Sequence, residues 1–263
     1  MYYPIQLPFL LNKQFTDVMN YQEIINSECS EFVLCFWSMY PKSEGRSSVK
    51  NIIIADGCID LIVDFDNKQI FFSGNRRTDF EYDIQMPAYF FGARLMPGAF
   101  HQLTGLSADK AMDDFILLEE VFDDLDQETI FGGTFEYSQM RFQEYLTKKF
   151  EDKVPNDFTC LFSKLFESIP QTSKELYNQL YFSPRQCQRN FSKNFGLSPK
   201  MVLSILRFQK CLKLLTSEKA KSVDILVATN YYDQSHFNHD FKQYLGITPL
   251  ELVARYKNDA FLQ

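Results

Sequence analysis

The residues whose types and spacing best fit a binding role in this sequence are two arginines and a glutamine. Arg185, Gln188 and Arg189 lie at positions i, i+3 and i+4, so on a helix they share one face. Arginine pairs in bidentate fashion with guanine and glutamine with adenine, so such a face can read base edges in a major groove. Cys187 and Phe191 would then point inward. The alternative is that Arg185 and Arg189 are only solvated helix charges.

Carboxylates and histidines offer other chemistry, but their spacing does not favour it. Asp56 and Asp60 could act as a general acid and base, yet no histidine or third acidic residue lies in local register. A turn-forming Asp56 and an Asp60 that bonds nearby backbone are the favoured alternative. His236 and His239 would share a helix face, but zinc needs further ligands and none is close in sequence.

The six cysteines form no C-x-x-C pair and no Cys/His cluster at zinc-ligand spacing. We expect reduced core residues, with redox sensing by Cys58 as the alternative. We therefore predict no enzyme activity, no metal and no cofactor.

Arg94, at the end of an apolar run, could hold an anionic effector. A structural ion pair within an acidic domain is the favoured alternative. Together with Asp56 and Asp60, Arg94 forms our candidate effector-binding set.

The base-reading residues lie in the first copy of an internal repeat, residues 183–199, and the second copy spans residues 233–249. Each copy predicts a helix that ends at a glycine followed by Ser-Pro or Thr-Pro, which is a helix stop signal. A further short helix is expected upstream of each copy, at 172–180 and 222–229, so the pattern predicts two helix-turn-helix units. An amphipathic helix over 201–216 would hold the two readers about 34 Å apart, one turn of DNA.

This arrangement resembles the AraC/XylS family of bacterial transcription regulators over about residues 157–256. The motifs that carry the resemblance are Ser183-Pro184-Arg185-x-x-x-Arg189-x-Phe191, Gly196-x-Ser198-Pro199, Arg207-Phe208-x-x-Cys211-x-x-Leu214-Leu215 and Asp233-Gln234-Ser235-His236-Phe237-x-x-x-Phe241-Lys242-x-x-x-Gly246-x-Thr248-Pro249. Residues 55–62 and 91–99 are similar to segments of an uncharacterised sensor-like domain found ahead of such regulators.

The resemblance implies double-stranded promoter DNA as the partner, with RNA polymerase as a further partner if the protein is an activator. The expected DNA-binding residues are Arg185, Gln186, Gln188, Arg189, Lys193, Ser235, His236, Asn238, His239 and Lys242. Two departures matter: Tyr181 stands where the first turn usually has glycine, and His239 where the second reader often has arginine. The second unit could therefore contact mostly phosphates, through Lys242 and the helix N-terminus.

The formal net charge of −7 argues at first against DNA, but the charge is unevenly distributed. Residues 1–156 hold 13 basic and 25 acidic residues, a net of −12, whereas residues 157–263 hold 14 and 9, a net of +5. Such asymmetry suggests a nucleic-acid-binding region attached to an acidic body. A charge of only +5 also predicts weak binding by the basic half alone, so we expect a homodimer or an ordered interdomain arrangement.

The predicted fold class is α+β. Residues 1–150 would form a β-rich regulatory, sensor or dimerisation domain, an antiparallel meander or small barrel with flanking helices. The strand candidates are 32–39, 49–55, 59–65, 69–73 and 88–95; helix signals begin at Ser107 and Thr134. Residues 151–157 would be a linker and residues 158–258 the all-α DNA-binding domain.

We therefore expect a sequence-specific DNA-binding regulator, modulated by a small-molecule or protein effector at its N-terminal domain. The start of the chain shows no signal peptide and no apolar run is long enough for a membrane span, which predicts a cytoplasmic location and no membrane partner. The alternatives are an enzyme or a partner-binding sensor whose helical tail serves only as a DNA-addressing or protein-interaction module.

Overall fold

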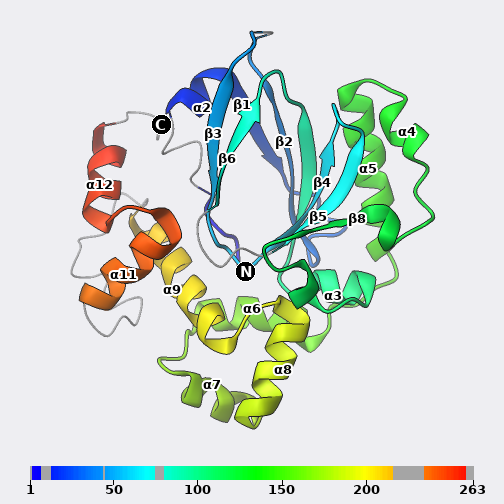
Figure 1. The fold of residues 1–263 in the computed structure, drawn as a ribbon. Helices are drawn as coiled ribbons and strands as arrows, with labels where there is room; N and C mark the ends of the chain where they lie inside the picture. The colour runs from blue at the N-terminus through cyan, green and yellow to red at the C-terminus, as the bar shows by residue number, and fades with distance from the viewer. Residues whose placement is uncertain (1, 7–12, 44, 75–79, 216–233, 259–263) are drawn as a thin grey trace.

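The computed structural model describes residues 2–6, 13–43, 45–74, 80–215 and 234–258. The prediction of a β-rich N-terminal part followed by an all-α part is confirmed (Figure 1). The N-terminal elements are α2 (Lys13–Val18), β1 (Met19–Ile24), β2 (Val33–Pro41), β3 (Ser48–Ile53), β4 (Ile59–Asp64), β5 (Gln69–Ser73), β6 (Phe80–Gln85), β7 (Phe90–Leu95), α3 (Ala99–Thr104), the short 3-10 helix η1 (Ala108–Ala111), β8 (Phe115–Leu117), the 3-10 helix η2 (Leu118–Glu120), α4 (Gln127–Phe131) and α5 (Phe135–Phe150). The C-terminal helices are α6 (Asp157–Glu167), α7 (Ser173–Leu180), α8 (Pro184–Phe195), α9 (Pro199–Leu215), α11 (Gln234–Leu245) and α12 (Pro249–Asn258).

The strands form two antiparallel sheets. Six strands lie in the order β1-β2-β7-β4-β5-β8, and β3 pairs with β6 in a separate two-stranded sheet. The expected strand over 69–73 is observed with the same bounds, and those over 32–39, 49–55, 59–65 and 88–95 are observed with bounds shifted by at most two residues. The short 3-10 helix η1 follows Ser107, where a helix start is predicted.

One detail of the expected meander is wrong. A meander would pair the strand over 49–55 with the next strand in sequence, over 59–65, but β3 pairs with β6, with Asn51 opposite Tyr82. The segment 54–58 therefore crosses between sheets and is not a hairpin turn. Strand β4 lies between β5 and β7 instead. A local turn signal cannot distinguish these two outcomes, because strand pairing is decided by which distant strands bury the apolar faces.

The two faces of the six-stranded sheet pack against different partners. Alternation along each strand sends successive side chains to opposite faces. On one face, Phe36 and Phe91 meet Phe142 of α5 in edge-on contacts. On the other face, Cys35, Trp37 and Met39 of β2 join α2 and the two-stranded sheet in a smaller core. Figure 1 shows α5 and the β3–β6 pair on opposite sides of the larger sheet.

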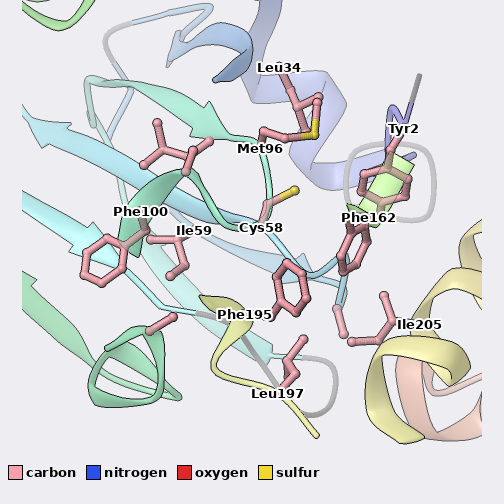
Figure 2. Packing of buried hydrophobic residues seen from close by; sticks show 14 of the residues in the cluster. Tyr2, Leu34, Cys58, Ile59, Met96, Phe100, Phe162, Phe195, Leu197 and Ile205 are labelled. Carbon is pink, nitrogen blue, oxygen red and sulfur yellow. The ribbon is translucent and has the colours of Figure 1, made fainter. Parts of the chain in front are cut away.

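The helical part shares the main core with the sheet. Phe162 of α6 and Phe195 of α8 are fully buried, and their ring centroids lie 5.5 Å apart. Phe162 also packs on the ring of Tyr2, 4.9 Å away, near Cys58 and Met96 (Figure 2). A single cluster of buried apolar residues thus runs from the strands into α6, α8 and α9.

Helix α5 ends at Phe150 and α6 begins at Asp157, with Asn156 as its N-cap. The intervening residues contain no helix or strand. Within the described residues, no helix is long and apolar enough to cross a membrane.

Candidate DNA-binding surface and interior cavity

The first predicted helix-turn-helix is formed by α7 and α8. Thr172 caps α7, accepting a hydrogen bond from the Glu175 amide. The turn passes through Tyr181, whose φ of 53° lies in the left-handed region that favours glycine. Ser183 then begins α8 with a capping box, followed by proline at the first helical position. These caps fix where α8 starts, and so which of its side chains face outward.

Helix α8 has the predicted two-faced character. Cys187 and Phe191 are fully buried, whereas Arg185, Gln188 and Arg189 are exposed together. Lys193 is exposed one turn further on. The sequence-based assignment of inward and outward residues in α8 is therefore confirmed as geometry, and its role in DNA contact remains a prediction.

Gln186 has a structural partner that the sequence analysis missed. Its Oε1 accepts a hydrogen bond from the Ser183 amide at 3.0 Å, so the side chain is part of the cap. The signal was present in the sequence as serine followed three residues later by glutamine. Gln186 therefore serves α8 itself, and its assignment to DNA is the weakest of the first set.

The second predicted reader is α11. Ser235, His239 and Lys242 are exposed, and Asn238 is half-buried. The side chain of His236 and the predicted helix over 222–229 lie outside the described residues. Asp240, on the inner side of α11, accepts a 2.7 Å hydrogen bond from Ser204 of α9.

Helix α9 connects the two candidate readers. Phe208 packs on Phe241 of α11 at 5.1 Å between ring centroids. Its neighbour Arg207 donates from Nη2 to the carbonyl oxygens of Pro170 and Gln171, at 2.8 and 2.7 Å. Helix α9 therefore contacts both α11 and the segment just before α7. Its observed range, Pro199–Leu215, is close to the predicted range of 201–216.

The N-terminal part touches α8 directly. Helix α8 packs against η1 and α3. Ser192 of α8 donates a hydrogen bond to Oδ2 of Asp109 in η1 at 3.1 Å. Ser192 lies seven residues after Arg185 and three after Arg189, so it falls on the same helical face. An acidic side chain of the N-terminal part therefore lies at the edge of the candidate DNA-binding face.

The candidate effector residues Arg94, Asp56 and Asp60 meet at an interior cavity of about 90 Å³ between the two sheets. Asp60 and Arg94 are direct cross-strand neighbours on β4 and β7. Arg94 is buried, and its Nη1 donates to Glu23 at 2.9 Å while its Nε lies 3.6 Å from carboxylate oxygens of Asp56 and Asp60. The structural ion pair considered as an alternative for Arg94 is therefore present.

Burial and charge shift the protonation equilibria here. Desolvation, helped by the neighbouring carboxylates of Asp56 and Glu23 and opposed by Arg94, raises the pKa of Asp60 to about 7. Burial also raises the pKa of the Cys58 thiol well above its usual range and that of Cys35 to about 12. A thiolate at Cys58 is thus disfavoured, which weakens the redox-sensing alternative.

Hydrogen bonds run from this cavity into the helical part. Gln6 donates from Nε2 to Oδ2 of Asp56 at 2.6 Å. The adjacent Ile5 amide donates to Oε1 of Gln209 in α9 at 2.8 Å, and Gln209 donates in turn to the Ala55 carbonyl at 3.3 Å. A short series of hydrogen bonds therefore connects the cavity wall to α9.

No cluster of three or more metal-ligating side chains occurs among the described residues. Sequence reasoning also missed Glu23, Tyr21 and Trp37 near the cavity. These residues are separated from Arg94 by more than fifty positions, and only the strand order brings them together. No local signal in the sequence marked them.

Comparison with protein families matches residues 176–255 to the family described as "Helix-turn-helix domain" and residues 26–116 to "Domain of unknown function (DUF6597)". No curated protein matches.

Solved structures include similar chains at low identity. A DNA-binding transcriptional dual regulator from Escherichia coli K-12 is 23% identical with a TM-score of 0.36, covering 40% of this chain and 96% of its own. ToxT from Vibrio cholerae is 13% identical with a TM-score of 0.39, covering 90% and 97%. An unsaturated fatty acid-bound ToxT is 11% identical with a TM-score of 0.42, covering 92% and 96%.

The family matches agree with the two-part fold and with the motifs on α8 and α9. The chain therefore combines an N-terminal DUF6597 domain with a C-terminal helix-turn-helix domain of the AraC type, the DNA-binding module of a transcription regulator.

Proposed function

We propose that this protein regulates transcription by placing two helix-turn-helix units in adjacent major grooves of promoter DNA. The observation that carries the proposal is that Arg185, Gln188 and Arg189 are all exposed on one face of α8. On the opposite face, Cys187 and Phe191 are fully buried. Arginine and glutamine on one helix face are the side chains best suited to read guanine and adenine.

In this proposal the second unit mainly contacts the sugar-phosphate backbone of the DNA. Lys242 supplies a point charge to a phosphate, and the exposed Ser235 lies in the first turn of α11, where free backbone amides favour anions. His239 is exposed as well. The first unit therefore supplies most of the sequence specificity, and the second fixes the position of the protein along the DNA.

We assign residues 1–150 to regulation, residues 151–157 to the connection and residues 158–258 to DNA binding. Two contacts support regulation by the N-terminal part. Asp109 reaches the edge of the α8 face through Ser192, and Gln209 links α9 to the backbone beside the cavity. A change in the N-terminal part can therefore alter both the charge beside α8 and the position of α9.

The excess of acidic residues in the N-terminal half reduces non-specific attraction to DNA. The basic half alone would bind weakly at physiological salt, because few cations are available to release counterions. Dimerisation on adjacent sites would then raise the affinity, and an activator would in addition contact RNA polymerase.

The test is selection of DNA ligands from a random pool with the purified full-length chain, followed by affinity measurements. We expect enrichment of a site that spans two adjacent major grooves. The variant Arg189→Ala should lose preference for that site, whereas Lys153→Ala, a cation in the connecting segment, should not. Failure to enrich any sequence at low salt would contradict the proposal and favour the reading as a sensor that acts through partner proteins.

A further inference from the structure

The cavity between the two sheets contains polar atoms that the surrounding protein leaves without hydrogen-bond partners. They are Nε1 of Trp37, Oδ1 of Asp60 and Nε of Arg94. Trp37 and Arg94 are 9% and 5% exposed, so neither side chain can rely on bulk water. Buried polar groups of this kind are costly and are often found where a ligand or an ordered water supplies the partner.

The charge around the cavity is negative in excess. Three carboxylates, those of Glu23, Asp56 and Asp60, surround the single guanidinium of Arg94. Asp56, Asp60 and Arg94 are the charged residues among the described side chains that line it. An anionic ligand would have to approach these carboxylates and displace one of them from Arg94. The cavity therefore disfavours an anionic ligand.

The carboxylates differ in how many partners they already have. Glu23 accepts hydrogen bonds from Tyr3, Tyr21 and Arg94. Asp56 accepts from Gln6 and from the Cys58 amide. Asp60, by contrast, keeps Oδ1 free of any hydrogen bond although it lies 3.6 Å from Arg94. Asp60 is therefore the acceptor that remains for a ligand.

The rest of the wall is aromatic and apolar. Phe15, Tyr21, Trp37 and Met39 line it together with Ile62. The Tyr21 and Trp37 rings are stacked, with centroids 6.4 Å apart. Gly92 makes room for the indole, since a Cβ there would meet the Trp37 ring at 2.9 Å. Aromatic faces attract cations as well as alkyl groups.

Cavity volume limits the size of the ligand. An engineered apolar cavity of about 150 Å³ holds benzene, with six heavy atoms. The cavity here, of about 90 Å³, therefore has room for about four heavy atoms without rearrangement.

We propose that this cavity binds a small organic cation, a short alkyl chain with a protonated amine, whose ammonium group pairs with Asp60 while its chain lies against Trp37. The inference deepens the proposed function and rests on it, because it names the effector class of the regulatory domain. Asp56 couples the cavity to Gln6, and from there the hydrogen bonds continue through Ile5 to α9.

The test compares three probes of nearly equal size with the full-length protein: propylammonium, propan-1-ol and propionate. Binding is measured by titration calorimetry and by the shift in melting temperature, at constant ionic strength set with sodium chloride. We expect propylammonium to bind at least tenfold more tightly than either other probe. Equal affinities, a preference for propionate or no saturable binding of propylammonium would overturn the inference.

Variants locate the site. Asp60→Asn should reduce propylammonium affinity at least tenfold, because it removes the charge that pairs with the ammonium. Asp123→Asn makes the same change in net charge at an exposed position away from the cavity and should leave affinity unchanged. Trp37→Phe keeps an aromatic wall and should weaken binding less than Asp60→Asn. An Asp60→Asn protein that is folded by circular dichroism and binds like the wild type would contradict the assignment.

Binding to the selected DNA is recorded separately for each protein. A protein that binds DNA but no probe overturns the inference alone. A protein that binds propylammonium but enriches no DNA overturns the proposed function and leaves the cation site standing.

Discussion

Removing the charge of Asp109 should strengthen DNA binding. Asp109 accepts the hydrogen bond from Ser192, which lies on the same face of α8 as Arg185 and Arg189. In the proposed complex, that carboxylate would stand close to the DNA backbone. The variant Asp109→Asn keeps the size of the side chain and its capacity to accept a hydrogen bond, and removes the charge.

The magnitude follows from Coulomb's law. One unit charge at about 8 Å from a phosphate costs about 0.5 kcal/mol in water. Screening at physiological ionic strength reduces each such term, since the Debye length is also about 8 Å, but several phosphates lie within reach. We expect a gain of about 0.5–1 kcal/mol, which is a two- to fivefold lower Kd.

The assay is fluorescence anisotropy with the selected DNA site at two salt concentrations. The gain should shrink at high salt, because it is electrostatic. Asp123→Asn is the matched control, with the same change in net charge at an exposed position. If Asp109→Asn bound no better than this control, the acidic contact would play no part in DNA affinity, and the placement of Ser192 on the DNA face would be refuted.

Four further predictions concern single residues. Arg189→Ala should lose about 1–3 kcal/mol on the selected site and little on random DNA, measured by competition binding. Lys242→Ala should weaken binding to all sequences alike and lower the salt slope by about one, in a salt titration. Tyr181→Gly should raise the free energy of unfolding by about 0.5–1 kcal/mol in urea, since it relieves a positive φ at a fully exposed position; no change would mean that the turn is unstrained. Because the folded-state pKa of Asp60, about 7, exceeds its unfolded value of about 3.9, the stability that Asp60 contributes is present at acidic pH and lost as pH rises towards 7. Urea unfolding should therefore show wild type losing stability relative to Asp60→Asn by up to about 1.4 kcal/mol per pH unit between pH 4 and 7, and parallel pH profiles would contradict the raised pKa.

The helical half could be predicted closely because its signals are local. Thr172 and Ser183 cap helices that begin where these residue types predict, and Gly196 ends α8 with a φ of 71°. Caps and stop signals depend on residues within one or two turns, so a single sequence carries them. The same locality made Gln186 a recognisable capping partner, although the sequence analysis assigned it to DNA.

The sheet could be predicted only in part because pairing depends on distant residues. The strand over 69–73 was recognised from composition, whereas β1, β6 and β8 were not. β-propensity reports that a segment fits a pleated surface and says nothing about its neighbour. The separation of β3 from β4 into different sheets creates the cavity, so Asp60 and Arg94 could be listed as candidates but their meeting with Trp37 could not be foreseen.

The acidic side chains of the N-terminal half are placed more specifically than the sequence alone suggests. The sequence alone suggests an acidic body that merely repels DNA. The structure places part of that acidity at two specific points: Asp109 beside the α8 face, and the carboxylates around Arg94 beside the cavity. In the proposed function, the first point would act on DNA affinity directly. The second would act through the hydrogen bonds that Gln6 donates to Asp56 and that the Ile5 amide donates to Gln209 of α9. A singly charged cation in the cavity would reduce the negative charge of the second cluster and leave the first in place. Asp109→Asn and a bound ammonium ligand should therefore change DNA affinity by independent amounts, and a double-variant cycle of Asp109→Asn with Asp60→Asn, measured with and without propylammonium, should give a coupling free energy close to zero.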